Sequence, residues 1–426
     1  MWGLFTHRAK AWHGLIALSL LSISQITVAA TVSSIRLEDA VDRTLKNNPE
    51  LVAFGYQIQA QQGRLTQAQV KPSLELGLVV ENALGTGDYQ GIDGTETTLS
   101  LGWVLERGKR EAYVSAARAG ISALEAQKEI HRLDATAKTT HLFLENLEYQ
   151  ERLRLSHEAT ALAEQTVATV RKRATAGRAP TADLARAEAE LARVRLATED
   201  VSHELKTARR WLAAQWGVPQ ADFSKVVGDP HRLPSPGSFT SLLEAVDRNP
   251  NLLAFLSQRR LREAELQSAK AQAKPDWRFN AGIRRLELTG DNAFVAGVVI
   301  PLTTQNRNQG SVAEARANLD MTEADRAATR LQIEAKLFAV YQALQHSLHR
   351  SVTLREEVLP RLEIAAIETQ RAYEAGRYSY YELQVIQTEL IATRMELLDA
   401  AVETHQRLIE IERLTGAAMP SAVQNP

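Results

Sequence analysis

The hydrophobic positions along most of this chain recur at steps of three and four residues, the period of a helix. Residues 109–173 contain no Pro and a single Gly, and they are rich in Ala, Leu, Glu, Arg and Gln, which are strong helix formers. A helix of that length would span roughly 95 Å, more than the width of a globular core. We therefore expect two long antiparallel helical hairpins, over about residues 109–216 and 311–415, with a kink at Pro360 in the second.

The packing face of these helices is expected to be narrow. In the second hairpin the apolar residues form one stripe between polar positions, which consists of Leu337, Tyr341, Leu344, Leu348 and Val352. Such a stripe is typical of coiled coils. The helices should therefore form an extended bundle and not a compact globule.

Four shorter segments follow a period of two instead. They cover about residues 73–83, 97–106, 276–286 and 293–302, and in each of them apolar residues alternate with small or polar ones. Strands of about ten residues with one apolar face are typical of a sheet that faces lipid. One pair of these strands precedes each helical hairpin.

The chain also repeats itself. The stretch "AGRAPTADLARAEAELARVR" returns as "AGRYSYYELQVIQTELIATR", "NNPELVAF" returns as "RNPNLLAF", and "AQVKP" returns as "AQAKP". We therefore expect a first repeat over 31–216 and a second over 241–416. A Pro-rich linker or irregular surface layer is expected at 217–240, and a C-terminal tail at 417–426.

The N-terminus and the composition limit the possible functions. Residues 1–30 combine early cations, an apolar run and a small-residue end, the order of a cleavable secretory signal peptide. The chain contains no Cys, so we expect neither disulfides nor a lipid-modified Cys. A formal net charge of −1 makes a nucleic-acid partner unexpected. No later apolar run is long enough for a transmembrane helix, so membrane entry would require a β-barrel.

Four strands cannot close a barrel, and open sheet edges are not tolerated in lipid. Two copies of the chain would give eight strands and a filled interior, whereas three copies would give twelve and leave a lumen. We therefore expect a homotrimer in which the duplicated hairpins form a helical tube around one axis. The fold class is mainly α with a small β-barrel part.

At this point the sequence resembles the TolC family of outer-membrane efflux proteins, over about residues 35–416. The family's turn motif, a Gly followed six residues later by an acid and then Leu or Val, occurs twice, at Gly177 and Gly376. The segments "ERGKR" and "PLTTQNRNQG" resemble the cobalt-zinc-cadmium resistance, or CzcC-like, branch. The resemblance implies a trimer with a twelve-stranded outer-membrane barrel and a periplasmic tunnel. It also implies two partners, a periplasmic adaptor (membrane fusion protein) and an inner-membrane, proton-driven RND pump.

The two repeated turns are the best candidates for a functional site. A Gly that ends a helix can adopt the left-handed conformation that closes the last turn, and Ser379 with Glu382 fits a capping box. Geometry alone is one explanation of the turns. The resemblance implies another, in which both turns lie at the periplasmic tip. The adaptor would then approach Gly177 and Gly376, and Arg178 and Arg377 would contact neighbouring hairpins.

Asp183 and Glu382 also admit two interpretations. An acid in the first turn of a helix is favoured by the helix dipole. Alternatively, a ring of these acids narrows the periplasmic aperture and favours cations. The ring would contain fewer acids than in some family members, because the position nine residues after each Gly is Arg186 in one repeat and Val385 in the other.

No arrangement of nucleophile, base and orienting group is apparent, so we expect neither an enzyme nor a cofactor. His346 and His349 lack the carboxylate or thiolate that would complete a metal site. We expect the outer-membrane channel of a tripartite RND-type efflux system that exports divalent cobalt, zinc and cadmium cations. A channel for multidrug efflux or type I protein secretion is the nearest alternative. A periplasmic coiled-coil protein without a pore is an alternative of another class.

Overall fold

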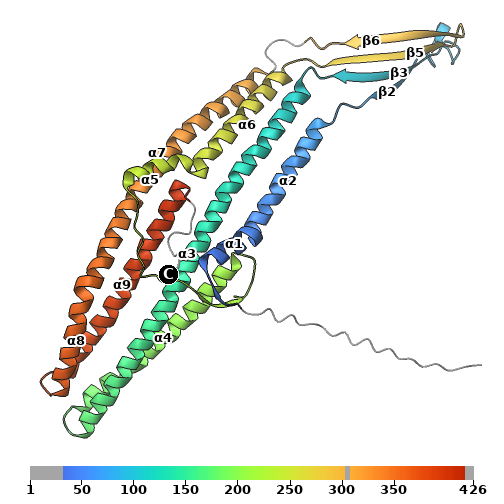
Figure 1. Cartoon of the computed structure of the whole chain (residues 1–426). Helices are drawn as coiled ribbons and strands as arrows, with labels where there is room; N and C mark the ends of the chain where they lie inside the picture. The colour runs from blue at the N-terminus through green and yellow to red at the C-terminus, as the bar shows by residue number, and fades with distance from the viewer. Residues whose placement is uncertain (1–31, 303–307, 418–426) are drawn as a thin grey trace, which may run out of the picture.

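The computed structural model describes residues 32–302 and 308–417 (Figure 1). The expected signal peptide, residues 303–307 of the "PLTTQNRNQG" segment and residues 418–426 of the expected tail lie outside the described residues. The chain forms an elongated molecule with a four-stranded sheet at one end and two helical turns at the other (Figure 1).

The sheet is antiparallel throughout and has the strand order β2-β3-β5-β6. Its strands are β2 (Glu75–Glu81), β3 (Glu96–Leu105), β5 (Trp277–Leu286) and β6 (Asp291–Val299). Residues paired across the strands share a face, and one such row is Leu78, Leu99, Ile283 and Phe294. All four are exposed, so one face of the sheet is apolar and uncovered in the single chain.

The opposite face of the sheet is built mainly from small and polar residues, with a few valines such as Val295, which pairs with Gly282. Gly77, Ser100 and Gly282 form one row of it. A side chain at Gly282 would collide with the backbone of Leu99, so only glycine fits the close approach of β3 and β5 there. The alternation expected from the sequence is therefore present, with the apolar set on one face and the small set on the other.

Long helices lead from the sheet to the far end of the molecule. The main helices are α1 (Leu37–Asn47), α2 (Pro49–Gln69), α3 (Lys109–Thr175), α4 (Thr181–Ala214), α6 (Pro250–Gln272), α7 (Gln309–Thr353), α8 (Leu359–Glu374) and α9 (Tyr380–Thr415). A short helix, α5 (Phe239–Ala245), and a 3-10 turn (Val246–Arg248) lie directly before α6. Near the sheet α2, α3, α6 and α7 lie side by side, and toward the turns α3 packs on α4 and α9, with α8 beside α9 (Figure 1).

The interruption expected at Pro360 takes the form of a wider helical turn. Residues Leu354–Val358 form a π-helix between α7 and α8, and Pro360 lies in the first turn of α8. Proline cannot donate the backbone hydrogen bond that a continuous helix needs, so the wider turn occurs directly before it. Along α7 the expected stripe buries Leu337 and Leu344 completely, but Val352 at its end is 42% exposed. The expectation for Val352 is wrong in the single chain, because the buried positions at this end of α7 are Ser351 and Leu354 on either side of it.

The repeated Asn-Pro segments tie each repeat together at the middle of the molecule. Asn48 accepts hydrogen bonds from the first backbone N–H groups of α2, and its Nδ2 donates to the carbonyl of Gln215 just past α4, at 2.8 Å. Asn249 caps α6 in the same way and donates to the carbonyl of Leu414 in α9, also at 2.8 Å. One asparagine in each repeat therefore satisfies both the start of its first long helix, α2 or α6, and the end of its last helix, α4 or α9.

The segment 217–240 is not a purely irregular linker. It contains β4 (Phe223–Val226), which pairs in parallel with β1 (Val32–Ile35). Phe223, Val226 and Ile35 are buried against α3 and α4 in one core cluster with Phe143 and Leu212. Strands of four residues are too short to show a reliable period, which is why the sequence alone indicated no strand here.

No helix in residues 32–302 or 308–417 is both long enough and apolar enough to cross a membrane.

Candidate functional site

The two repeated turns lie next to each other at the end of the molecule opposite the sheet (Figure 1). The first joins α3 to α4 and the second joins α8 to α9. Gly177 has a φ of 71° and Gly376 a φ of 77°, the left-handed conformation expected of a helix-ending glycine. The bonding is also the same in both, because Arg178 N–H donates to the carbonyl of Arg173 and Arg377 N–H to that of Ala372. Both repeats therefore end their long helix in the same way.

Arg173 joins the two turns within one chain. Its Nη1 donates to the carbonyl of Tyr373 at 2.6 Å and to that of Glu374 at 2.9 Å, at the end of α8. Its Nη2 lies 3.4 Å from the carbonyl of Arg178 in its own turn. The guanidinium also lies over the ring of Tyr373, with 4.7 Å from Cζ to the ring centroid. A single cation therefore satisfies backbone carbonyls of both hairpins.

A small apolar cluster, here called the tip core, supports these turns. It consists of Val167, Val170, Ala187, Tyr373, Tyr380 and Leu383, which come from α3, α4, α8 and α9. Burial raises the pKa of both tyrosines, and the nearby Asp183 carboxylate adds to the rise. Asp183 lies beside the tip core, because its neighbour Leu184 packs against that cluster.

Glu382 has a structural partner. Its carboxylate accepts hydrogen bonds from the backbone N–H of Ser379 at 2.7 Å and from the Ser379 hydroxyl at 2.8 Å, while the Ser379 hydroxyl accepts from Glu382 N–H at 3.3 Å. The expected capping box is thus confirmed. These bonds, the backbone one first, hold the pKa of Glu382 below its ordinary value. The carboxylate is therefore ionised and fixed beside the turn.

The sequence-based candidates are partly brought together. Gly177 and Gly376 occupy equivalent turns, and Asp183 and Glu382 occupy the first turns of α4 and α9. The side chains of Arg178 and Arg377 are exposed, and they make no hydrogen bond or ion pair with any described residue. The cation that does span the two hairpins is Arg173. Sequence reasoning missed it, because one Arg near a helix end carries no distinguishing pattern.

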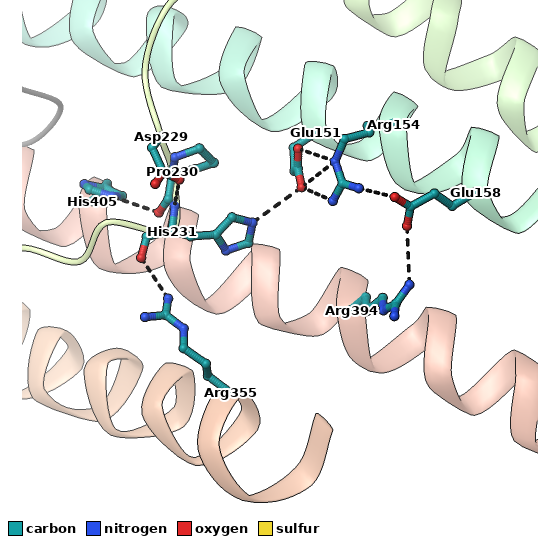
Figure 2. Close-up of polar contacts among 9 residues, drawn as sticks. All are labelled: Glu151, Arg154, Glu158, Asp229, Pro230, His231, Arg355, Arg394 and His405. Carbon is teal, nitrogen blue, oxygen red and sulfur yellow. Dashed lines mark hydrogen bonds and ion pairs between the residues drawn. The ribbon is translucent and has the colours of Figure 1, made fainter. Parts of the chain in front are cut away.

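A second polar cluster lies at the middle of the molecule, where the segment 229–231 crosses α3 and α9 (Figure 2). The fully buried His405 on α9 bonds through Nε2 to the carbonyl of Pro230 at 3.0 Å. From the π turn, Arg355 donates to the carbonyl of His231 at 2.8 Å. His231 Nε2 lies 3.6 Å from a carboxylate oxygen of Glu151 on α3. Three separate elements therefore hold the connection between the two repeats in place.

Acid is expected to weaken this cluster. Hydrogen bonding to Arg154 is the main cause that lowers the pKa of Glu151, partial burial opposes it, and His231 adds to the lowering. A carboxylate with a depressed pKa in the folded protein contributes stability above its unfolded pKa of about 4.3, and this contribution is lost as the pH falls through the folded value. The melting temperature of the wild type should therefore exceed that of Glu151→Gln at pH 7, and the gap should shrink below about pH 4. A gap that stays constant to pH 3 would contradict this role.

Within residues 32–302 and 308–417, no group of three or more His, Cys, Asp or Glu side chains is arranged to hold a metal ion. His346 and His349 are both exposed on α7.

Comparisons with known proteins agree with this architecture. The family model described as outer membrane efflux protein matches residues 40–218 and 242–417. The cobalt-zinc-cadmium resistance protein CzcC of Cupriavidus metallidurans is 27% identical over 380 residues, 89% of this chain and 90% of CzcC. The cation efflux system protein CusC of Escherichia coli K12 is 25% identical over 400 residues, 85% of this chain and 82% of CusC.

Solved structures share the fold. A crystal structure of CusC superposes with a TM-score of 0.72 at 17% identity and covers 90% of this chain and 92% of that one. The outer membrane protein VceC of Vibrio cholerae gives a TM-score of 0.71 at 20% identity, with 89% and 96% covered. Efflux proteins of the outer membrane are transport channels and not enzymes. Because the family model matches well over half of its length, the chain belongs to the family of outer membrane efflux proteins.

Proposed function

We propose that this protein is the outer-membrane channel of a tripartite efflux system that exports divalent cations such as cobalt, zinc and cadmium. The observation that carries the substrate is the similarity to CzcC along nine-tenths of both chains. The chain would act with a periplasmic adaptor and an inner-membrane RND pump. It would provide the path for the transported cations and would catalyse no reaction.

Three copies would form the channel. In the single chain β2 and β6 are the edge strands of the sheet, and open edges are not stable in lipid. Three copies would close the sheet into a twelve-stranded barrel with its apolar face outward. The helices at the two lateral edges of the chain also carry exposed apolar residues that copies could cover, namely Val52, Tyr56, Leu196 and Trp211 on α2 and α4, and Leu331, Phe338, Ile364 and Ile367 on α7 and α8.

The turns at the far end would meet the adaptor. A side chain added at Gly177 would have no neighbour within 4 Å, so its backbone is open to a partner. Arg178 and Arg377 are exposed beside the two glycines and are available for contacts with an adaptor or with the next copy. Equivalent turns in both repeats would give the trimer six similar docking positions.

The aperture is expected to favour cations. The double variant Asp183→Asn/Glu382→Gln removes two charges per copy, and Gln at 382 retains the capping geometry. The ratio of cation to anion permeability in a planar bilayer should fall by about twofold or more. As a control, Glu199→Gln/Asp200→Asn neutralises two exposed acids on α4 and should change nothing. Equal ratios in all three proteins would rule out the acid ring and leave the channel assignment standing.

The substrate is tested by the growth of a deletion strain, with plasmid complementation, on zinc, cobalt, cadmium, nickel, copper and a panel of hydrophobic drugs. Sensitivity confined to divalent metals is the expected result. Drug sensitivity with normal metal tolerance would favour a multidrug channel, and a secretion defect alone would favour type I protein secretion. A purified protein without trimer or conductance would favour a periplasmic coiled-coil protein without a pore.

A further inference from the structure

The repeated "AQVKP" and "AQAKP" stretches lie at the foot of the sheet. Helix α2 ends at Gln69 and α6 at Gln272, and each is followed by an exposed lysine, Lys71 or Lys274. The proline after each lysine disfavours further helix, and β2 or β5 then begins. Both repeats therefore place one lysine between a helix and the first strand of its hairpin.

The strand pairing places both lysines at the same end of the sheet. Glu75 pairs with Gly102, and Trp277 pairs with Leu105. Lys71 precedes Glu75 by four residues and Lys274 precedes Trp277 by three, so both lie just beyond the paired residues, at the end of the sheet nearest the helices. This is the junction between β3 and α3, where Arg107 is also exposed. Lys71, Arg107 and Lys274 are here called the basic collar.

The collar adjoins the aromatic end of the apolar face. The guanidinium of Arg107 lies over the ring of Trp277, at 5.1 Å from Cζ to the ring centroid. The ring of Trp277 lies 6.3 Å from that of Phe279, which stacks on Trp103 at 5.5 Å. The ring pairs of Trp103, Phe279 and Trp277 therefore lie at the end of the apolar face nearest the helices, and the cations follow directly after them.

The backbone at this junction is held in an unusual conformation. Arg107 has a φ of 47° and Gly108 a φ of 87°, and a left-handed conformation is unfavourable for a residue such as Arg. Lys109 forms an ion pair with Asp276 at 2.8 Å, which fixes α3 against the start of β5. In contrast, no ion pair with a described residue is present for Lys71, Arg107 or Lys274, so their charges are not neutralised within the described part of the chain.

We propose that the basic collar binds the phosphate groups of anionic phospholipids in the membrane leaflet that faces the helices. Aromatic rings favour the boundary between hydrocarbon and headgroups, and lysine and arginine just beyond it attract anionic lipid. The trimer would present nine such cations in a ring. The inference rests on the proposed orientation, with the sheet in the membrane and the helices in the periplasm.

The test uses the full-length trimer in nanodiscs of equal parts phosphatidylcholine and phosphatidylglycerol. After mild detergent extraction, mass spectrometry measures the ratio of the two lipids that remain bound. We expect the wild type to retain phosphatidylglycerol at least about twofold above its bulk share, and this excess to fall in 0.5 M salt. The triple variant Lys71→Gln/Arg107→Gln/Lys274→Gln should retain the two lipids in their bulk ratio.

Two further variants separate binding from general effects. Lys71→Arg/Arg107→Lys/Lys274→Arg conserves the charges and should keep the excess of phosphatidylglycerol. This variant tests the proposal even if the neutral variant does not assemble. Arg36→Gln/Lys206→Gln/Lys225→Gln removes three exposed cations near the middle of the molecule and should keep it too. No excess in the wild type, or equal loss in this control, would overturn the proposal. Neither result depends on metal export, so a failure of the proposed substrate is detected separately by the growth assay.

Discussion

A Gly376→Trp variant is expected to lose metal resistance completely, so that its growth falls to that of the deletion strain, while the trimer still forms. The native φ of 77° costs a residue with a side chain about 1 to 2 kcal/mol. A Cβ at this position would also lie 3.5 Å from Nη2 of Arg173, so the indole would occupy the space beside both turns. The strain is local, whereas the proposed docking of the adaptor needs this backbone to be accessible. Resistance is measured by growth on zinc and cadmium, and assembly by the unheated trimer band on a gel.

Two controls separate docking from backbone strain. Asn tolerates the left-handed conformation better than other residues with side chains, so Gly376→Asn should retain most of the resistance. Gly91→Trp places the same bulk in the connection between β2 and β3, at an exposed glycine with a similar φ of 79° where a side chain meets no atom within 4 Å, and should retain it as well. Full resistance in Gly376→Trp would disprove the role of this turn in docking.

An Arg173→Gln variant is expected to separate the two turns. It removes the charge-assisted bonds to the carbonyls of Tyr373 and Glu374 and the contact with the Tyr373 ring. A hydrogen bond to a charged group contributes about 1.5 to 3 kcal/mol, and because one of the two bonds is exposed to water we expect a total loss of about this size. Amide hydrogen exchange at residues 174–180 and 372–379 should therefore become roughly 10- to 100-fold faster, with no change around Asn48 and Asn249.

The conservative variant decides what the guanidinium contributes. Lysine keeps the charge but cannot present a planar fork of donors, so Arg173→Lys should give intermediate exchange rates. Arg171→Gln is a matched control on the same helix, because Arg171 pairs with Glu188 within the first hairpin. Unchanged exchange in Arg173→Gln would mean that the tip core alone holds the hairpins together.

The sequence predicted the parts of this fold that repeat a period many times. A helix of 67 residues and strands of seven to ten residues contain enough positions for their period to be distinct. The four-residue strands β1 and β4 do not, and their pairing joins residues almost two hundred positions apart. The π turn before Pro360 was predictable as an interruption but not in its form, since proline indicates only which hydrogen bond is lost.

In the candidate site, too, the local features could be predicted from the sequence and the long-range contacts could not. Gly177, Gly376 and the capping box of Ser379 and Glu382 are local features, and their conformations follow from neighbouring residues. Arg173 acts across two hairpins, on carbonyls two hundred positions away, and its role depends on tertiary packing that one sequence does not reveal. Asn48 and Asn249 stand between these cases. Their Asn-Pro pairs indicate helix starts, but their bonds to the ends of α4 and α9 needed the structure.

Asn48 and Asn249 each join the start of one long helix to the end of the last helix in the same repeat. Everything that extends away from these contacts, toward the sheet or toward the tip, can change in length by whole helical turns without moving them. Evolution could thus fit the channel to membranes and pumps at different separations by inserting or deleting turns in both repeats together. The contacts of Asn48 and Asn249 would stay in place while the helices toward the sheet and the helices toward the tip change in length.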